Sequence, residues 1–166
     1  VVAAMDTTQL QAIGTGNIAN LTTAQVQAVS TDKLSSLTSA QVQNLSSTQI
    51  NALSSSQFQS LNSSGVKSLS TSTLVGLSTA QMAALSSTEF AALSSVQVQN
   101  LGATQVAALG SAVLGALQTQ QVPGITTAQL SSISSTQLSA LSTAALAQLT
   151  STQAGGLSSS LVSSLS

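Results

Sequence analysis

Large apolar residues recur at two fixed positions of an eight-residue repeat along the whole chain. Stepping by eight from Met5 to Leu165 gives 21 positions, and each of them is large and apolar. A second column runs from Val2 to Val162, and 20 of its 21 residues are large and apolar, Ala154 being the exception. No insertion or deletion breaks the register. Such regularity predicts one continuous array of about 20 repeats over residues 1–166.

The polar positions of the repeat carry the signals of helix starts. The consensus is Leu-Ser-(Ser/Thr)-x-Gln-Val-x-Ala, as in residues 45–52. The position after the first Leu is almost always Ser, Thr, Asp, Asn or Gly, which are the preferred N-cap residues. Three positions later Gln occurs in 12 of 20 units and Glu once, which completes a capping box. We therefore predict that helix starts are capped by Ser46 with Gln49, Ser78 with Gln81, and Ser86 with Glu89.

Neither one long helix nor one long strand accommodates this pattern. Eight residues in an α-helix rotate by about 800°, so each column would drift by about 80° per unit around the helix. In a strand, two positions five residues apart face opposite sides. We predict an all-α solenoid of very short capped helices, one per repeat, each of about six residues. A β-solenoid, in which turns reset the parity, is the alternative, although Ala and Gln are poor strand formers.

Both apolar columns are expected to face the interior of the solenoid. Burying two side chains per unit contributes about 3–6 kcal/mol, whereas ordering eight residues costs about 12 kcal/mol. Each unit therefore depends on its neighbours for stability. The predicted core includes Leu21, Val26, Leu45, Ile50, Leu53, Phe58, Leu85, Phe90, Leu101 and Val106.

One unit, residues 117–124, departs from the pattern. It carries Gln118 at the cap position, Pro123 where a helical amide would be needed, and Gly124 at its end. Proline inside a helix costs about 3 kcal/mol. We therefore expect an irregular unit at this point of the array.

Composition narrows the range of functions. Asp6, Asp32, Lys33, Lys67 and Glu89 are the only charged residues, and the chain has no His, Cys, Trp or Tyr. The commonest general bases and metal ligands are absent, so we expect no catalytic activity, no metal site and no cofactor. Two lysines and two Phe are too few to bind nucleic acid. Both lysines are expected to lie on the solvated surface.

Self-association is the expected mode of partnership. The repeat runs to both ends of the sequence without an atypical polar unit of the kind that closes soluble solenoids. End-to-end contacts that do not close on themselves generate filaments. Membrane insertion is not expected, because no apolar run approaches the roughly 18–20 residues that span a bilayer.

The units at residues 21–28 (Leu-Thr-Thr-Ala-Gln-Val-Gln-Ala) and 133–140 (Ile-Ser-Ser-Thr-Gln-Leu-Ser-Ala) have a familiar form. They resemble the Leu-Thr-Thr-x-Gln-Val-x-Ala arrays of long, secreted, low-complexity surface proteins of bacteria, which are adhesin-like. The resemblance covers essentially the whole chain. It implies an extracellular, cell-surface location and a structural or adhesive role.

These observations lead to two expected functions. The first is a structural protein that forms a cell-surface filament or stalk by stacking and head-to-tail assembly of repeats. The alternative is an adhesin or binding module, whose face rich in Ser, Thr and Gln contacts surface glycans, ice or a host surface.

Overall fold

A computed structural model describes residues 2–157, 161 and 163 of the chain. Residues 2–157 form eighteen α-helices of four to six residues and two 3-10 helices, and no strand occurs among them. The α-helices are α1 (Thr7–Gln11), α2 (Thr15–Ala19), α3 (Thr23–Gln27), α4 (Thr31–Ser35), α5 (Ser39–Gln43), α6 (Ser47–Ala52), α7 (Ser55–Gln59), α8 (Ser63–Ser68), α9 (Thr71–Val75), α10 (Thr79–Ala84), α11 (Ser87–Ala91), α12 (Ser95–Asn100), α13 (Ala103–Ala107), α14 (Ser111–Gly115), α15 (Thr127–Ser132), α16 (Ser135–Ser139), α17 (Thr143–Leu146) and α18 (Ser151–Gly155). The 3-10 helices are η1 (Val2–Ala4) and η2 (Val122–Gly124). The prediction of an all-α solenoid is confirmed, and the β-solenoid alternative is wrong for this part of the chain.

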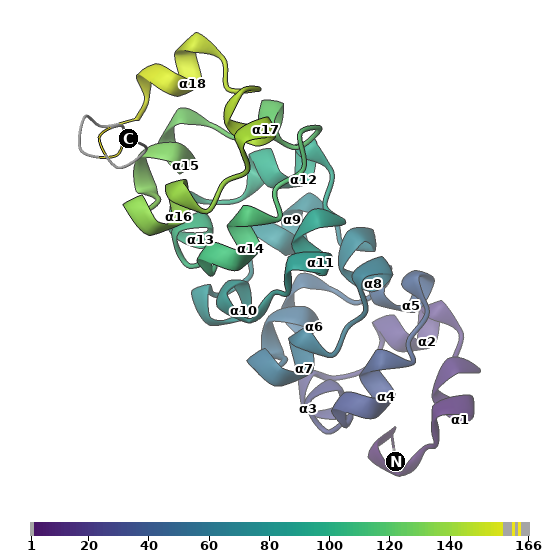
Figure 1. Cartoon of the computed structure of the whole chain (residues 1–166). Helices are drawn as coiled ribbons and strands as arrows, with labels where there is room; N and C mark the ends of the chain where they lie inside the picture. The colour runs from purple at the N-terminus through teal and green to yellow at the C-terminus, as the bar shows by residue number, and fades with distance from the viewer. Residues whose placement is uncertain (1, 158–160, 162, 164–166) are drawn as a thin grey trace.

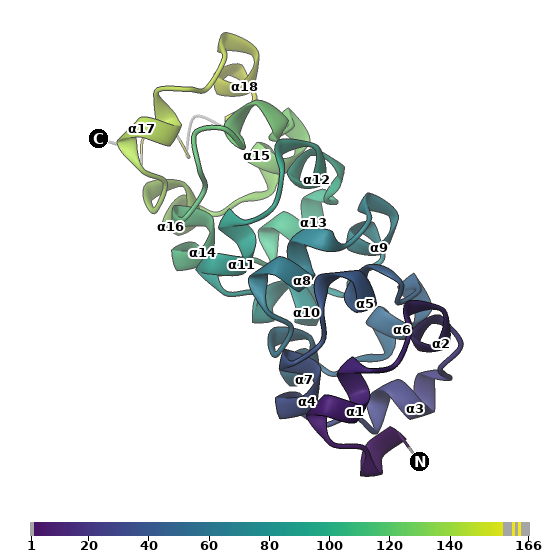
Figure 2. The same ribbon diagram turned by 90° about the vertical axis from the view of Figure 1, so that its right-hand side faces the viewer.

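Successive helices wind around a common axis into an elongated superhelix, with α1 and α18 toward opposite ends (Figure 1, Figure 2). Most helices pack against the third element along the array, as α2 does against α5 and α3 against α6, and η2 counts as one element of this series because α12 packs against it. Hydrogen bonds between neighbouring turns join residues that are 25 to 31 positions apart. One superhelical turn therefore contains between three and four repeats.

The helices are short because each eight-residue repeat contains an N-cap residue, and the extended backbone at that residue ends the preceding helix. The N-cap residues have extended backbone, for example Ser54 with φ −63° and ψ 161°. The residue before the cap is also extended where a six-residue helix ends, as at Leu53 with φ −66° and ψ 139°. No described residue has positive φ, so the corners form without left-handed glycine. The ends of the helices are thus set by the next cap rather than by a special C-terminal residue.

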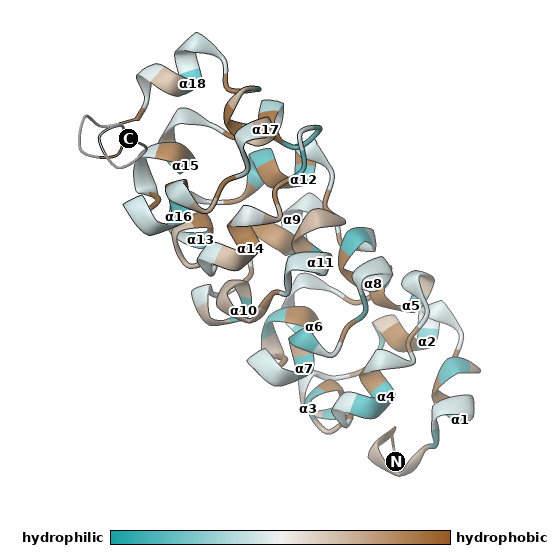
Figure 3. Ribbon diagram, in the orientation of Figure 1, coloured by the Kyte–Doolittle hydropathy of each residue, from teal (hydrophilic) through white to brown (hydrophobic). Residues whose placement is uncertain are grey.

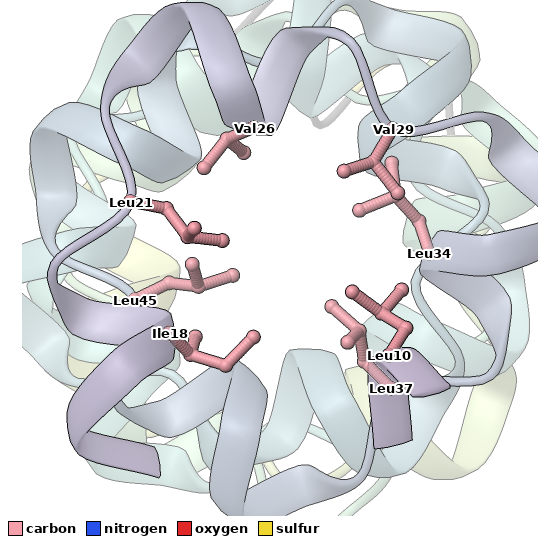
Figure 4. A pocket seen from close by; sticks show the side chains of 8 residues that line it. All are labelled: Leu10, Ile18, Leu21, Val26, Val29, Leu34, Leu37 and Leu45. Carbon is pink, nitrogen blue, oxygen red and sulfur yellow. The ribbon is translucent and has the colours of Figure 1, made fainter. Parts of the chain in front are cut away.

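Both apolar columns face the axis of the superhelix. Apolar and polar segments alternate along the array (Figure 3). Side chains of the first turns converge on a narrow apolar space along the axis (Figure 4). Phe58 and Phe90 are completely buried. Of the other predicted core residues, those that are buried are Val26, Leu45, Ile50, Leu53, Leu85, Leu101 and Val106.

Leu21 differs from the prediction because it is only partly buried, although it packs against the core. It lies in the first superhelical turn, together with the partly buried Met5 and Ile13 of the same column. In later turns the same column is covered by the turn before it, as at Leu37, which is 4% exposed. Burial of this column therefore increases where a preceding turn packs against it.

The cap residues allow a direct test of what a side-chain cap contributes. Ser142 begins α17 and accepts a hydrogen bond from the backbone N–H of Ala145 at 3.1 Å. Ser30 begins α4 with similar backbone geometry but makes no such side-chain bond. Ser142→Ala is expected to lower the free energy of unfolding by about 1 kcal/mol, and Ser30→Ala by clearly less. Urea unfolding followed by circular dichroism measures both, and equal losses would contradict the assignment of the cap bond.

The unit at residues 117–124 has a turn and η2 where other units have an α-helix. Pro123 lies in the first turn of this 3-10 helix, where its missing N–H leaves no helical bond unmade. Val122 and Gln121 are nevertheless completely buried. The unit therefore keeps its place in the stack despite its altered backbone.

The described helices also settle one point about membranes. The longest of them has six residues, and none has the length and apolar character needed to cross a bilayer.

Candidate functional site: the glutamine ladder between turns

Because the N-cap residue and the glutamine recur three positions apart along the chain, most helix starts have a reciprocal pair of hydrogen bonds. In α6 the Ser46 backbone N–H donates to Gln49 Oε1 at 2.7 Å, and the Gln49 N–H donates to Ser46 Oγ at 3.2 Å. The corresponding pair in α10 measures 3.0 and 3.2 Å. These bonds pair N–H groups that a helix leaves free in its first turn. The structure thus places the predicted pairs Ser46–Gln49 and Ser78–Gln81 in capping boxes.

The same glutamines also connect one superhelical turn to the preceding one. Gln129 Nε2 donates to the carbonyl oxygens of Val98 at 2.8 Å and Leu101 at 2.7 Å. Its Oε1 accepts from the Thr126 N–H at 2.7 Å, so the buried amide is fully hydrogen-bonded. We call such a bond between turns a rung, and the series of them the glutamine ladder.

Ten glutamines form rungs with the same spacing, each to carbonyls 28 to 31 residues earlier. They are Gln41, Gln49, Gln57, Gln81, Gln97, Gln105, Gln121, Gln129, Gln137 and Gln153. All except Gln57 are buried. The acceptors belong to the ends of helices in the preceding turn, where carbonyl groups lack helical partners. Each rung therefore pairs the start of one helix with the end of another.

Residues that replace glutamine in this column show what the position requires. Lys33 donates from Nζ to the Ala3 carbonyl oxygen at 2.6 Å, 30 residues earlier, so it forms a rung with a different donor. This bond differs from the expected solvated position of Lys33. Thr73 is too short to reach the preceding turn's carbonyls and bonds to the Ser70 and Ser47 hydroxyls. Donor capacity, rather than the amide itself, is the shared property of Lys33 and the glutamines.

Glu89 fills the same position without the donor. Its Oε2 accepts from the Ser86 N–H at 2.7 Å, so the predicted capping pair is present. Its Oε1 is buried and has no hydrogen-bond partner. Burial raises the pKa of Glu89 above its ordinary value, and the hydrogen bonds from Ser86 only partly oppose this effect.

The sequence predicted the capping half of this arrangement but not the rungs. The available signal was the choice of glutamine in 12 units against glutamate in one. A capping box uses only a side-chain acceptor at this position, which either residue supplies. So strong a preference for the amide indicates a second requirement for a donor.

Comparison with known proteins agrees with the repeat geometry. The ALTTAQ repeat model matches this chain over residues 2–39 and 31–63. Each match is somewhat longer than the 28 to 31 residues joined by a rung, so each covers about one superhelical turn. Residues 21–25 read Leu-Thr-Thr-Ala-Gln, like the name of that repeat. Among curated proteins, none matches the chain.

The chain is a repeat protein, and its repeat continues beyond the residues that the ALTTAQ model matches. The rung of Gln153, for instance, has the same geometry as that of Gln49, with acceptors 31 and 28 residues earlier in both. In the part of the chain that the structure describes, no three His, Cys, Asp or Glu side chains lie together as a metal-binding group. The arrangement joins backbone to backbone through side-chain amides, and its chemistry is that of turn-to-turn association.

Proposed function

We propose that this chain is an extracellular structural protein that builds a cell-surface filament or stalk by stacking superhelical turns. The glutamine ladder is the observation that carries the proposal. It gives every turn the same donors on the side of the preceding turn and the same acceptors on the opposite side. An interface of this kind is heterologous and extends without closing on itself. The resemblance to secreted bacterial surface arrays supports the cell-surface location.

The first turn that the structure describes carries donors of the kind that such an interface needs. Gln9 and Gln25 make capping boxes with Asp6 and Thr22, but both side chains are exposed and form no rung among the described residues. In the later part of the described chain, Leu141 lies at the repeat position whose carbonyl accepts a rung in other turns. Leu109, for example, accepts from Gln137 at 2.7 Å. Stacking a second copy on the first turn would pair donors with acceptors by the geometry already used inside the chain.

The test is to alter the outward donors without altering the caps. In the double variant Gln9→Glu, Gln25→Glu, the carboxylates still accept the cap N–H bonds. They cannot donate to carbonyl groups of another copy. We expect the unchanged protein to form filaments at high concentration and the double variant to remain monomeric, as seen by electron microscopy and sedimentation.

Two further measurements make the test decisive. The double variant should unfold at the same urea concentration as the monomeric unchanged protein, because neither residue forms a rung with the residues that the structure describes. Monodisperse, compact particles of the unchanged protein at high concentration would contradict the proposal. Filaments that persist in the double variant would contradict the role of the ladder in assembly.

A second candidate function is favoured by one surface feature. Lys67, Ser95 and Gln120 contribute polar groups to a groove beside the irregular unit, which residues 91–94 also line. Hydroxyl, amide and ammonium groups are suitable hydrogen-bond partners for a polysaccharide. Binding of glycans by the assembly-deficient double variant would support an adhesive role in place of, or beside, a structural one.

A further inference from the structure

Glu89 interrupts the glutamine ladder near the middle of the described chain. Its flanking rungs are made by Gln81, which donates to the Ile50 carbonyl at 2.9 Å, and Gln97, which donates to the Leu69 carbonyl at 2.9 Å. Glu89 itself is 4% exposed. Its Oε1 is the one buried side-chain oxygen or nitrogen without a hydrogen-bond partner among the described residues.

The register of the ladder identifies the groups that a rung at this position would join. Rungs reach carbonyls 31 and 28 residues earlier, which for position 89 are those of Phe58 and Leu61. An ionised carboxylate only accepts hydrogen bonds, so it cannot pair with a carbonyl oxygen. A protonated carboxyl group has one O–H donor, and it can make the bond that the amide makes elsewhere.

We propose that Glu89 is a proton-binding site at the contact between two superhelical turns, here called the seam. When the carboxyl is protonated, its O–H makes the hydrogen bond to the preceding turn, and when it is ionised this bond is lost and the seam is weaker. The donor–acceptor distances of the rungs, for example 2.7 Å for Gln129 to Leu101, match those of an O–H···O bond. This property goes beyond the proposed structural function and does not depend on it.

No counter-charge replaces the missing donor. Helix α11 packs against α8 and α14. On these two elements Lys67 of α8 is the only charged residue, and its side chain is exposed to solvent in the groove beside Ala91 and Ala92. The residues of α14 and of the adjacent α10 and α12 carry no charge. Ionisation of Glu89 is therefore opposed by burial without relief from a cation.

The direction of the pH dependence follows from the raised pKa of Glu89 in the folded chain. The folded state binds the proton more tightly than the unfolded state, so stability falls as pH rises between the two pKa values. The contribution is fully present below the ordinary pKa of the carboxyl, 4.5, and is lost as pH rises through the raised value. Acid should thus tighten this seam.

The experiment compares the unchanged chain with Glu89→Gln, which supplies the missing donor, by urea unfolding at pH values from about 4.5 to about 7.5. At the upper end, Glu89→Gln is expected to lower the equilibrium constant of unfolding about tenfold, because the amide makes the buried hydrogen bond that the carboxylate cannot make. The difference should shrink as pH falls. Asp32→Asn, which removes an exposed carboxylate, serves as the control for the change in net charge.

Two outcomes would overturn the proposal. Parallel pH profiles for the unchanged chain and Glu89→Gln would show that Glu89 does not bind a proton on folding. Stabilisation of the unchanged chain by calcium or sodium chloride at neutral pH, but not of Glu89→Gln, would assign the site to a metal cation instead. Hydrogen exchange gives a local readout: at neutral pH the amide of Ser86, which donates to Glu89, should exchange faster in the unchanged chain than in Glu89→Gln.

Discussion

Replacing Gln129 with glutamate is expected to lower the free energy of unfolding by about 2–4 kcal/mol at pH 7. Gln129 is 2% exposed, and its Nε2 donates to the carbonyls of Val98 and Leu101 at 2.8 and 2.7 Å. Glutamate keeps the acceptor for the Thr126 N–H but loses both rung bonds. It also places a buried carboxylate against carbonyl oxygens, so part of the loss should be recovered at acid pH, where the carboxyl is protonated.

Gln25→Glu is the matched control for this change. Gln25 makes the same capping box, with the Thr22 N–H donating to its Oε1 at 2.8 Å, but it is exposed and forms no rung within the described chain. The midpoint of urea unfolding, followed by circular dichroism at a concentration where the protein is monomeric, compares the two variants. Equal losses at positions 25 and 129 would mean that the capping box, and not the rung, accounts for the stability.

The sequence predicted those features that are encoded within a single repeat. The spacing of Leu, Ser, Gln and Val determines where each helix starts, which side chains are buried and which caps form, because these depend on residues fewer than eight positions apart. Ile50 and Phe58, both completely buried, and the capping box of Ser46 with Gln49 are such cases. Local chemistry was sufficient for them.

Features that depend on the superhelical turn were not predicted. A rung joins residues 28 to 31 positions apart, and that separation is a consequence of how the short helices turn at each corner. The partial burial of Leu21 has the same origin, since it depends on the neighbouring turn rather than on the repeat itself. Lys33 illustrates the point further: its bond to the Ala3 carbonyl at 2.6 Å becomes visible only when successive turns are stacked.

The irregular unit combines both kinds of feature. Pro123 predicted a break in the helix, which is a local effect. The structure adds that Gln121 of the same unit keeps its capping bond to the Gln118 N–H at 2.8 Å and its rung to the Leu93 carbonyl at 2.7 Å. The ladder is therefore maintained where the helix is not, which indicates that turn-to-turn bonding rather than helical structure keeps the array in register.

Gly124→Ala is expected to lower the free energy of unfolding by about 3 kcal/mol. Gly124 is buried at the end of η2, and a methyl group at this position would overlap the backbone carbonyl of Ser95 in the preceding turn. Because the obstacle is backbone, neither side can give way by a change of rotamer. The 3-10 geometry brings the two backbones together, so the shift required would disturb the seam between turns.

Gly155→Ala separates this steric effect from the general effect of adding a methyl group. Gly155 lies in α18, and a methyl group there meets no atom within 4 Å. Alanine favours helix by about 1 kcal/mol over glycine, so this variant should be as stable as the unchanged chain or more so. Urea unfolding of both variants measures the contrast. Equal stability of Gly124→Ala and Gly155→Ala would contradict this prediction. It would mean that the two turns can move apart at the irregular unit at little cost in free energy.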